Sequence, residues 1–220
     1  MNVAKIFLEI QRRRASVTLV VLGAWATAVM GGWCWLISYG AQTNAPVGLP
    51  VNAWPESSQI RFCEGRWNLV LFAHPKCACT KATVREMHRL IVNLNREGDH
   101  RVEVKVLVST PAYPSAEWTQ TSLLQQIHDL PSATVQFDRG GHQSRKFAVN
   151  TSGTVMLFGP DRNLRFRGGI TIARGHEGDS VGQGSIRALV SGRHSAITDA
   201  PAFGCTLCFD ERPSGLEDVL

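Results

Sequence analysis

The chain has 220 residues, of which 44% are hydrophobic and 19% are charged, and its formal net charge is +5. These proportions are those of a globular protein, and they argue against a disordered chain and against a channel with many membrane spans. Residues 1–15 contain four basic residues and one glutamate, whereas residues 16–38 carry no charge. Much of the positive charge therefore precedes an apolar segment, and the rest of the chain has too little to predict a nucleic-acid-binding surface.

The first predicted element is a membrane anchor. Residues 16–38 form an uncharged run of 23 residues, and an α-helix needs about 20 to cross the hydrocarbon core. Trp33 and Trp35 lie near its far end, where an aromatic belt is expected, and three arginines at 12–14 precede it. The sequence thus predicts a cytoplasmic basic segment at 1–15, one helix in the inner (cytoplasmic) membrane, and a periplasmic or otherwise extracytoplasmic domain. A cleaved signal peptide is the alternative, but its apolar region typically has about 7–15 residues.

A linker and an alternation of strands and helices follow. Residues 39–59 contain three prolines without periodicity, which predicts the linker. Short apolar or alternating runs predict strands at 67–73, 101–109, 133–137, 153–159 and 163–167. A 3–4 spacing of apolar residues predicts helices at 80–96, 116–130, 142–148 and 180–191. The turn at 160–163 indicates an antiparallel hairpin.

This order predicts the fold class. Strands that alternate with helices form a parallel sheet covered by helices, and the late hairpin adds antiparallel strands. We therefore expect an α/β fold with three layers, α/β/α, and a mixed sheet, preceded by one transmembrane helix. The folded domain is predicted at 60–195, and residues 196–220 are predicted to form an irregular C-terminal tail.

A Cys-x-Cys motif is the main candidate for chemistry. Residues 74–80 read His-Pro-Lys-Cys-Ala-Cys-Thr, after the first predicted strand and at the start of the next helix. The positive end of the helix macrodipole stabilises a thiolate there, and Lys76 and His74 add positive charge. The motif predicts a nucleophilic, solvent-reachable thiol at Cys77. The alternative is that Cys77 and Cys79 pack as small hydrophobic residues.

The motif also carries a resemblance to a known family. Residues 69–77 resemble the segment of the thioredoxin superfamily that leads from strand to active site, with Cys77 at the attacking position. The chain is similar in particular to membrane-anchored RedB-like proteins, on the HPKCxC run and on segments 168–171 (Gly-Gly-Ile-Thr) and 174–178 (Arg-Gly-His-Glu-Gly). The resemblance covers about residues 50–195 and implies a thioredoxin-like fold with redox-active cysteines.

Two departures from thioredoxins qualify this resemblance. Thioredoxins carry Cys-x-x-Cys, which would place the second thiol at Thr80, whereas here Cys79 comes one position earlier. Thioredoxins also have a cis-proline where this chain has Gly153, followed by Thr154. A cis bond before a non-proline residue costs about 2.5–4 kcal/mol, so a trans bond is expected. Without the proline, docking of a disulfide substrate is less certain and a usual barrier to metal binding is absent.

The remaining cysteines have several interpretations. Cys205 and Cys208 form a Cys-x-x-Cys motif in the tail. They are candidates to resolve a mixed disulfide on Cys77, to complete a four-thiolate metal site with Cys77 and Cys79, or to form a local disulfide. Cys63 has no local partner.

The predicted function is a membrane-tethered, extracytoplasmic thiol-disulfide oxidoreductase without a cofactor, acting on protein thiols and disulfides and not on nucleic acid. Its catalytic thiols are predicted to be Cys77 and Cys79, supported by His74, Lys76, Gly153 and Thr154. One alternative is a non-enzymatic module in which Cys77, Cys79 and His74 hold Cu(I) or Zn. Another is an inactive thioredoxin-fold interaction domain. The loop 174–179, with His176 and Glu177, is predicted either to tune the cysteine site or to be a charged surface turn.

Overall fold

The computed structural model describes residues 3–41, 51–98 and 101–207. It divides into two compact units, residues 1–42 and 43–220. The predicted linker residues 42–50 and the tail from Cys208 onward lie outside the described residues.

The first unit is a single long helix, α1 (Val3–Ala41). No proline interrupts this segment, so the helix extends beyond the predicted 16–38 at both ends. The side chains of residues 12–39 are exposed, and many of them are large and apolar. The stretch Arg12–Tyr39 is long and apolar enough to cross a membrane, although signal sequences near an N-terminus share these properties.

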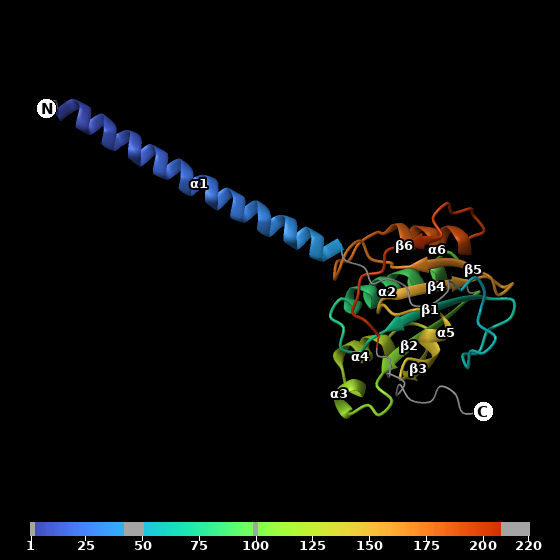
Figure 1. Ribbon diagram of the computed structural model, residues 1–220. Coiled ribbons are helices and arrows are strands. Elements are labelled where there is room, and N and C mark those ends of the chain that lie inside the picture. The colour runs from blue at the N-terminus through green and yellow to red at the C-terminus, as the bar shows by residue number, and fades with distance from the viewer. Residues whose placement is uncertain (1–2, 42–50, 99–100, 208–220) are drawn as a thin grey trace, which may run out of the picture. The chain divides into compact units, whose positions relative to one another are not determined.

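The second unit is built on one six-stranded mixed sheet with the order β3-β2-β1-β4-β5-β6. Its strands are β1 (Trp67–Ala73), β2 (Val102–Thr110), β3 (Ala133–Arg139), β4 (Thr154–Phe158), β5 (Leu164–Gly168) and β6 (Asp199–Ala200). Strands β1, β2 and β3 are parallel, β4 is antiparallel to β1 and to β5, and β6 is parallel to β5. Figure 1 shows these strands side by side between the helices. A parallel βαβ start followed by an antiparallel hairpin and a last helix is the thioredoxin-like arrangement that the sequence predicts.

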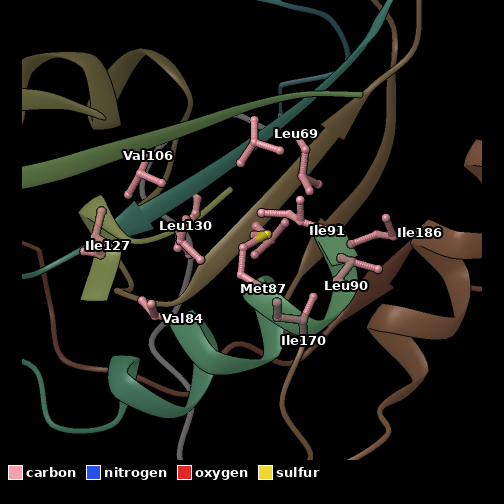
Figure 2. Close-up of a cluster of buried hydrophobic side chains, with 14 of the residues drawn as sticks. Leu69, Val84, Met87, Leu90, Ile91, Val106, Ile127, Leu130, Ile170 and Ile186 are labelled. Atoms are coloured by element: carbon pink, nitrogen blue, oxygen red, sulfur yellow. The ribbon is translucent and has the colours of Figure 1, made fainter. Parts of the chain in front are cut away.

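The helices of this unit are α2 (Thr80–Arg96), α3 (Ala116–Thr119), α4 (Ser122–His128), α5 (His142–Lys146) and α6 (Val181–Val190). Side chains of α2, α4 and α6 pack on one face of the sheet and form the larger core. Figure 2 shows Met87, Leu90 and Ile91 of α2 turned toward strand residues such as Leu69 and Val106. This packing fixes the start of α2 at the end of β1, where the Cys-x-Cys motif lies.

The smaller core covers the other face of the sheet. Trp54 is 4% exposed, and its ring makes edge contacts with Phe62, Phe147 and Phe158 at centroid distances of 5.0–5.3 Å. The backbone N–H of Trp54 donates to the Arg162 carbonyl. Residues just before position 60, which the sequence assigns to the linker, are thus part of the domain, because a buried aromatic side chain anchors them.

The element predictions are confirmed in type, with two corrections. The bounds of β1 and α2 are as predicted, and Arg162 takes a positive φ of 68° in the turn of the β4–β5 hairpin. The single helix predicted at 116–130 is wrong: α3 ends at Thr119, and Thr121 caps a new helix by accepting a hydrogen bond from the Leu124 N–H. The second correction is β6, a two-residue strand within the predicted irregular tail.

Candidate functional site

The Cys-x-Cys motif lies in the turn between β1 and α2. Cys77 donates its N–H to the His74 carbonyl, and the Cys77 carbonyl accepts from the Thr80 N–H at 3.2 Å. Cys79 is the N-cap residue of α2 and makes no side-chain capping bond. Cys77 therefore lies in the turn that leads into α2, two residues before the N-cap, rather than at the cap position itself.

The Cys77 thiol is enclosed. Cys77 is 1% exposed, so the predicted solvent-reachable position is wrong. The reason is that the tail folds back over the motif, and the Cys205 N–H donates to Cys77 Sγ at 3.3 Å. The sulfur is buried among polar donors rather than in apolar packing alone.

These donors set the acidity of the thiol. Burial raises the pKa of Cys77, but hydrogen bonds from the Thr80 hydroxyl and from the backbone and thiol of Cys205 outweigh this effect, so the pKa lies below its ordinary value. A thiolate at Cys77 is therefore favoured, as the sequence predicts. The donors are Thr80 and Cys205, and Lys76 is not among them.

A chain of hydroxyl groups supports the Thr80 donor. The His74 N–H donates to Ser152 Oγ at 2.8 Å, and the hydroxyls of Ser152 and Thr80 are 2.6 Å apart. Each hydroxyl has one proton to donate. When Cys77 is a thiolate, Thr80 donates its proton to Cys77, and Ser152 is then left to donate to Thr80. Sequence reasoning missed Ser152, although its position beside Gly153 was a signal.

The neighbouring thiols are less acidic than Cys77. Burial and the negative charge of Cys77 raise the pKa of Cys79, and Arg174 counteracts only part of this effect. Burial and the hydrogen bond to Cys77 raise the pKa of Cys205 to about 11. Cys77, Cys79 and Cys205 thus interact with one another, and among them only the pKa of Cys77 is lowered.

The tail reaches the site as an extended segment. The Ser152 N–H donates to the Cys205 carbonyl and the Leu207 N–H to the Asn150 carbonyl, each at 2.8 Å, and Thr151 and Thr206 form an antiparallel bridge. The backbone around Cys205 is irregular, as predicted, apart from this isolated bridge, through which the loop before β4 pairs with the tail.

The two supporting residues before Cys77 face α3. His74 Nδ1 accepts from the Lys76 N–H, and the His74 ring lies edge-on to Trp118 at 5.2 Å. Burial lowers the pKa of His74, so the ring is neutral at pH 7 and adds no positive charge. Lys76 Nζ pairs with Glu117 at 2.9 Å and lies 4.5 Å from the Trp118 ring.

Gly153 and Thr154 shape the loop that faces the motif. Gly153 has a φ of 88°, which proline cannot adopt, and its N–H donates to the Phe72 carbonyl at 2.8 Å. No peptide bond of the described residues is cis. The Thr154 hydroxyl donates to the Thr151 carbonyl at 2.7 Å, which holds the loop together.

The loop at 174–179 packs beside the site. Arg174 donates to the Gly204 carbonyl at 3.3 Å and hydrogen-bonds the Cys79 side chain. Glu177 pairs with Arg85 and Arg89 of α2 at 2.6 and 3.0 Å. Of the two readings that the sequence left open, the structure favours a loop that faces the cysteines, through Arg174 rather than through the exposed His176.

Two remaining expectations concern metal binding at the motif and the role of Cys63. Within the part of the chain that the structure describes, no three His, Cys, Asp or Glu side chains are grouped so that they could hold a metal ion. Cys63 lies apart from the motif, where Lys105 Nζ is 3.7 Å from its sulfur.

Comparisons with known proteins support the fold. No family model matches this chain, and neither does any curated protein. Among solved structures, a hypothetical protein of Sinorhizobium meliloti 1021 is similar, with a TM-score of 0.56 and 17% identity over 77% of this chain and 98% of that one. An uncharacterized conserved protein of Geobacillus kaustophilus has a TM-score of 0.54 and 19% identity over 80% and 94%. Yeast Sco1 follows with a TM-score of 0.45 and 15% identity over 60% and 84%.

The first two matches, with TM-scores above 0.5, show a shared fold, and at these identities nothing of activity. The second unit is a thioredoxin-like domain. Its closer resemblance to RedB-like proteins stays a prediction.

Proposed function

We propose that this chain is a membrane-tethered thiol-disulfide oxidoreductase in which Cys77 is the nucleophile and Cys205 the resolving cysteine. The observation that carries the proposal is the contact of Cys205, through both its N–H and its thiol, with a Cys77 sulfur whose pKa is lowered. The thiolate is the reactive form of cysteine, so a lowered pKa at the end of β1 serves thiol exchange.

The proposed exchange needs only the two thiols of Cys77 and Cys205 and the substrate disulfide. The tail segment that carries Cys205 encloses Cys77, so this segment must move aside before the Cys77 thiolate attacks one sulfur of a substrate disulfide, forms a mixed disulfide and releases the other substrate sulfur as a thiolate. Cys205 loses its proton and attacks the Cys77 sulfur, so that a Cys77–Cys205 disulfide forms and the second substrate thiolate leaves. The substrate disulfide gains two electrons and the two protein thiols lose them.

Cys205 is a better resolving residue than Cys79. The Cys79 thiol hydrogen-bonds Arg174 as well as Cys77 and lies two residues from Cys77 in a tight turn. Cys205 approaches from a separate segment, so a bridge to Cys77 is not confined to a single tight turn, and disulfide geometry is demanding. Cys79 and Cys208 are the other candidates from the sequence, and we expect neither Cys79→Ser nor Cys208→Ser to accumulate mixed disulfides in the test below.

The location of the domain is part of the same proposal. The apolar side chains of α1 are exposed over Arg12–Tyr39, and the arginines at 12–14 favour a cytoplasmic N-terminus. The domain would then face the periplasm, where disulfides persist. Protease added to intact spheroplasts should degrade the domain and spare a membrane-bound N-terminal fragment.

Reduction of an insulin disulfide by the full chain in detergent micelles, with dithiothreitol as the electron source, tests the activity. We expect Cys77→Ser to abolish catalysis and Cys205→Ser to accumulate mixed disulfides, while Cys63→Ser, a matched change outside the site, keeps wild-type rates. Equal rates in wild type and Cys77→Ser would refute the proposal. Stoichiometric copper or zinc that is lost in a Cys77→Ser, Cys79→Ser double variant would instead support the metal-binding alternative.

A further inference from the structure

The tail segment 203–207, here called the strap, is bound to the domain along its length. Its backbone pairs with the loop 150–152 through the two hydrogen bonds that flank the Thr151–Thr206 bridge. At one end the Gly204 carbonyl accepts from Arg174. At the other end Leu207 is 3% exposed and packs in the smaller core. The strap is therefore an ordered part of the domain.

The contact at Gly204 is too close for any side chain. A Cβ atom at this position would lie 1.8 Å from the Ser152 carbonyl oxygen and 2.7 Å from its carbon. These are backbone atoms of the loop that holds Cys205 against Cys77, so they cannot move away as a flexible side chain would. The seat of the strap thus depends on glycine at position 204.

In a reactive pair the nucleophilic cysteine is expected to be the more exposed of the two, but the strap gives the opposite arrangement. Cys77 is 1% exposed, whereas Cys205 is exposed to solvent. A thiol arriving from outside would meet the Cys205 sulfur first, and Cys77 would lie behind it.

We infer that the strap closes Cys77 and presents Cys205 in its place, so that outside thiols exchange at the Cys205 sulfur with Cys77 as the leaving group. This inference rests on the proposed function, because it requires the Cys77–Cys205 disulfide. An outside thiolate attacks the Cys205 sulfur, forms a mixed disulfide with Cys205 and releases Cys77 as a thiolate. A second outside thiol then reduces the mixed disulfide, which leaves both protein thiols reduced and the outside pair oxidised.

The acidities of the two thiols favour the same direction. A thiol of lower pKa leaves faster in disulfide exchange. Cys77, with its lowered pKa, is the better leaving group, whereas burial raises the pKa of Cys205 and makes it the worse one. Attack at Cys77 would require a thiol to reach a buried sulfur and to expel the poorer leaving group.

The test uses the oxidised full chain in detergent micelles with one equivalent of glutathione as the probe. Early products are quenched with acid, free thiols are alkylated, and peptides are mapped by mass spectrometry. We expect glutathione on Cys205 and the alkyl group on Cys77, at least tenfold above the reverse pattern. Glutathione mainly on Cys77 would overturn the inference, and so would oxidised protein bridged through Cys77–Cys79 or Cys205–Cys208.

A matched pair of glycine variants tests the strap itself. Gly204→Ala should displace it and move a large share of the glutathione to Cys77, whereas Gly184→Ala, where a Cβ meets nothing within 4 Å, should keep the wild-type pattern. An unchanged pattern in folded Gly204→Ala would contradict the closing role of the strap. If Gly204→Ala does not fold, amide hydrogen exchange in the wild type tests the strap instead. The Ser152 and Leu207 amides should exchange slowly, and fast exchange at both would show that the strap is not closed over Cys77.

The outcomes separate this inference from the proposed function. Insulin reduction with glutathione found on Cys77 would keep the function and reject the inference. Exchange at Cys205 without any turnover of insulin would reject the function and keep the assignment of the exchanging sulfur.

Discussion

The hydroxyl groups of Thr80 and Ser152 lie 2.6 Å apart, although 72 residues separate them in the chain. Both side chains are fully buried, at the start of α2 and in the loop before β4. Because Ser152 donates to Thr80 and Thr80 donates to Cys77, the two loops at the end of β1 jointly determine the acidity of one thiol. This coupling is the basis of the first prediction.

Thr80→Val should raise the pKa of Cys77, because it removes the hydroxyl that donates to the thiolate. A hydrogen bond to a charged group contributes about 1.5–3 kcal/mol, which corresponds to roughly one to two pKa units. The measurement is the ultraviolet absorbance of the Cys77 thiolate against pH in the full chain, with a Cys77→Ser difference spectrum. Thr80→Ser, which keeps the hydroxyl, should titrate like the wild type, and a wild-type titration in Thr80→Val would show that the hydroxyl has no such role.

Cys205 should make the reduced protein less stable at high pH. Its pKa rises from an ordinary value of 9.0 to about 11 on folding. A pKa that is raised on folding contributes stability below the unfolded value and loses it as pH increases toward the folded value. Between pH 9 and 11 the unfolded chain releases this proton more readily, so the free energy of unfolding should decline.

Chemical denaturation of the reduced full chain at several pH values measures this decline. Cys205→Ser should decline less steeply between pH 9 and 11 than the wild type, since serine does not titrate there. Parallel curves for the two proteins would contradict the raised pKa of Cys205. Cys34→Ser, a cysteine change on the separate helix α1, should follow the wild-type curve.

Local sequence patterns predicted much of the fold. The apolar run at 67–73 and the 3–4 spacing at 80–96 match β1 and α2. Burial of one or two faces of an element requires apolar residues at regular positions, and these are visible in the sequence. The same context identified Cys77 at a helix start. The tail motif also suggested Cys205 as a partner, although without a position in space.

The missed features depend on contacts between distant segments. The enclosure of Cys77 comes from a residue 128 positions away, and the polar support of Thr80 comes from Ser152. No spacing within one element reports such pairings. Trp54 was assigned to a linker for the same reason, because prolines end regular structure locally but do not show which aromatic side chain is buried against a sheet.

Trp54→Ala should destabilise the domain by about 3–5 kcal/mol, the usual cost of truncating a large buried aromatic residue. The ring packs against Phe62, Phe147 and Phe158, so its removal would leave a cavity among these side chains. Urea denaturation of the full chain in micelles measures the change. Glu56→Ala, an exposed site two residues further on, should stay within about 0.5 kcal/mol of the wild type. A Trp54→Ala loss no larger than that of Glu56→Ala would show that the domain begins later in the chain.

Gly153→Ala should destabilise the domain more than Gly65→Ala does. Both glycines have a positive φ, 88° and 71°, so each substitution incurs the strain of a left-handed backbone, about 1–2 kcal/mol. The surroundings differ: a Cβ at Gly153 would lie 3.0 Å from Thr83 Oγ1, whereas one at Gly65 meets nothing within 4 Å.

Subtracting the Gly65→Ala effect from the Gly153→Ala effect therefore isolates the crowding between the loop before β4 and α2. Thr83→Ala combined with Gly153→Ala should relieve this excess. The losses in free energy of unfolding of the two single variants, each relative to the wild type, should therefore add to more than the loss in the double variant. Strict additivity would mean that Thr83 does not confine the loop. In that case the loop position beside Cys77 would depend on hydrogen bonds such as those of the Gly153 N–H to the Phe72 carbonyl and of Ser152 to its partners.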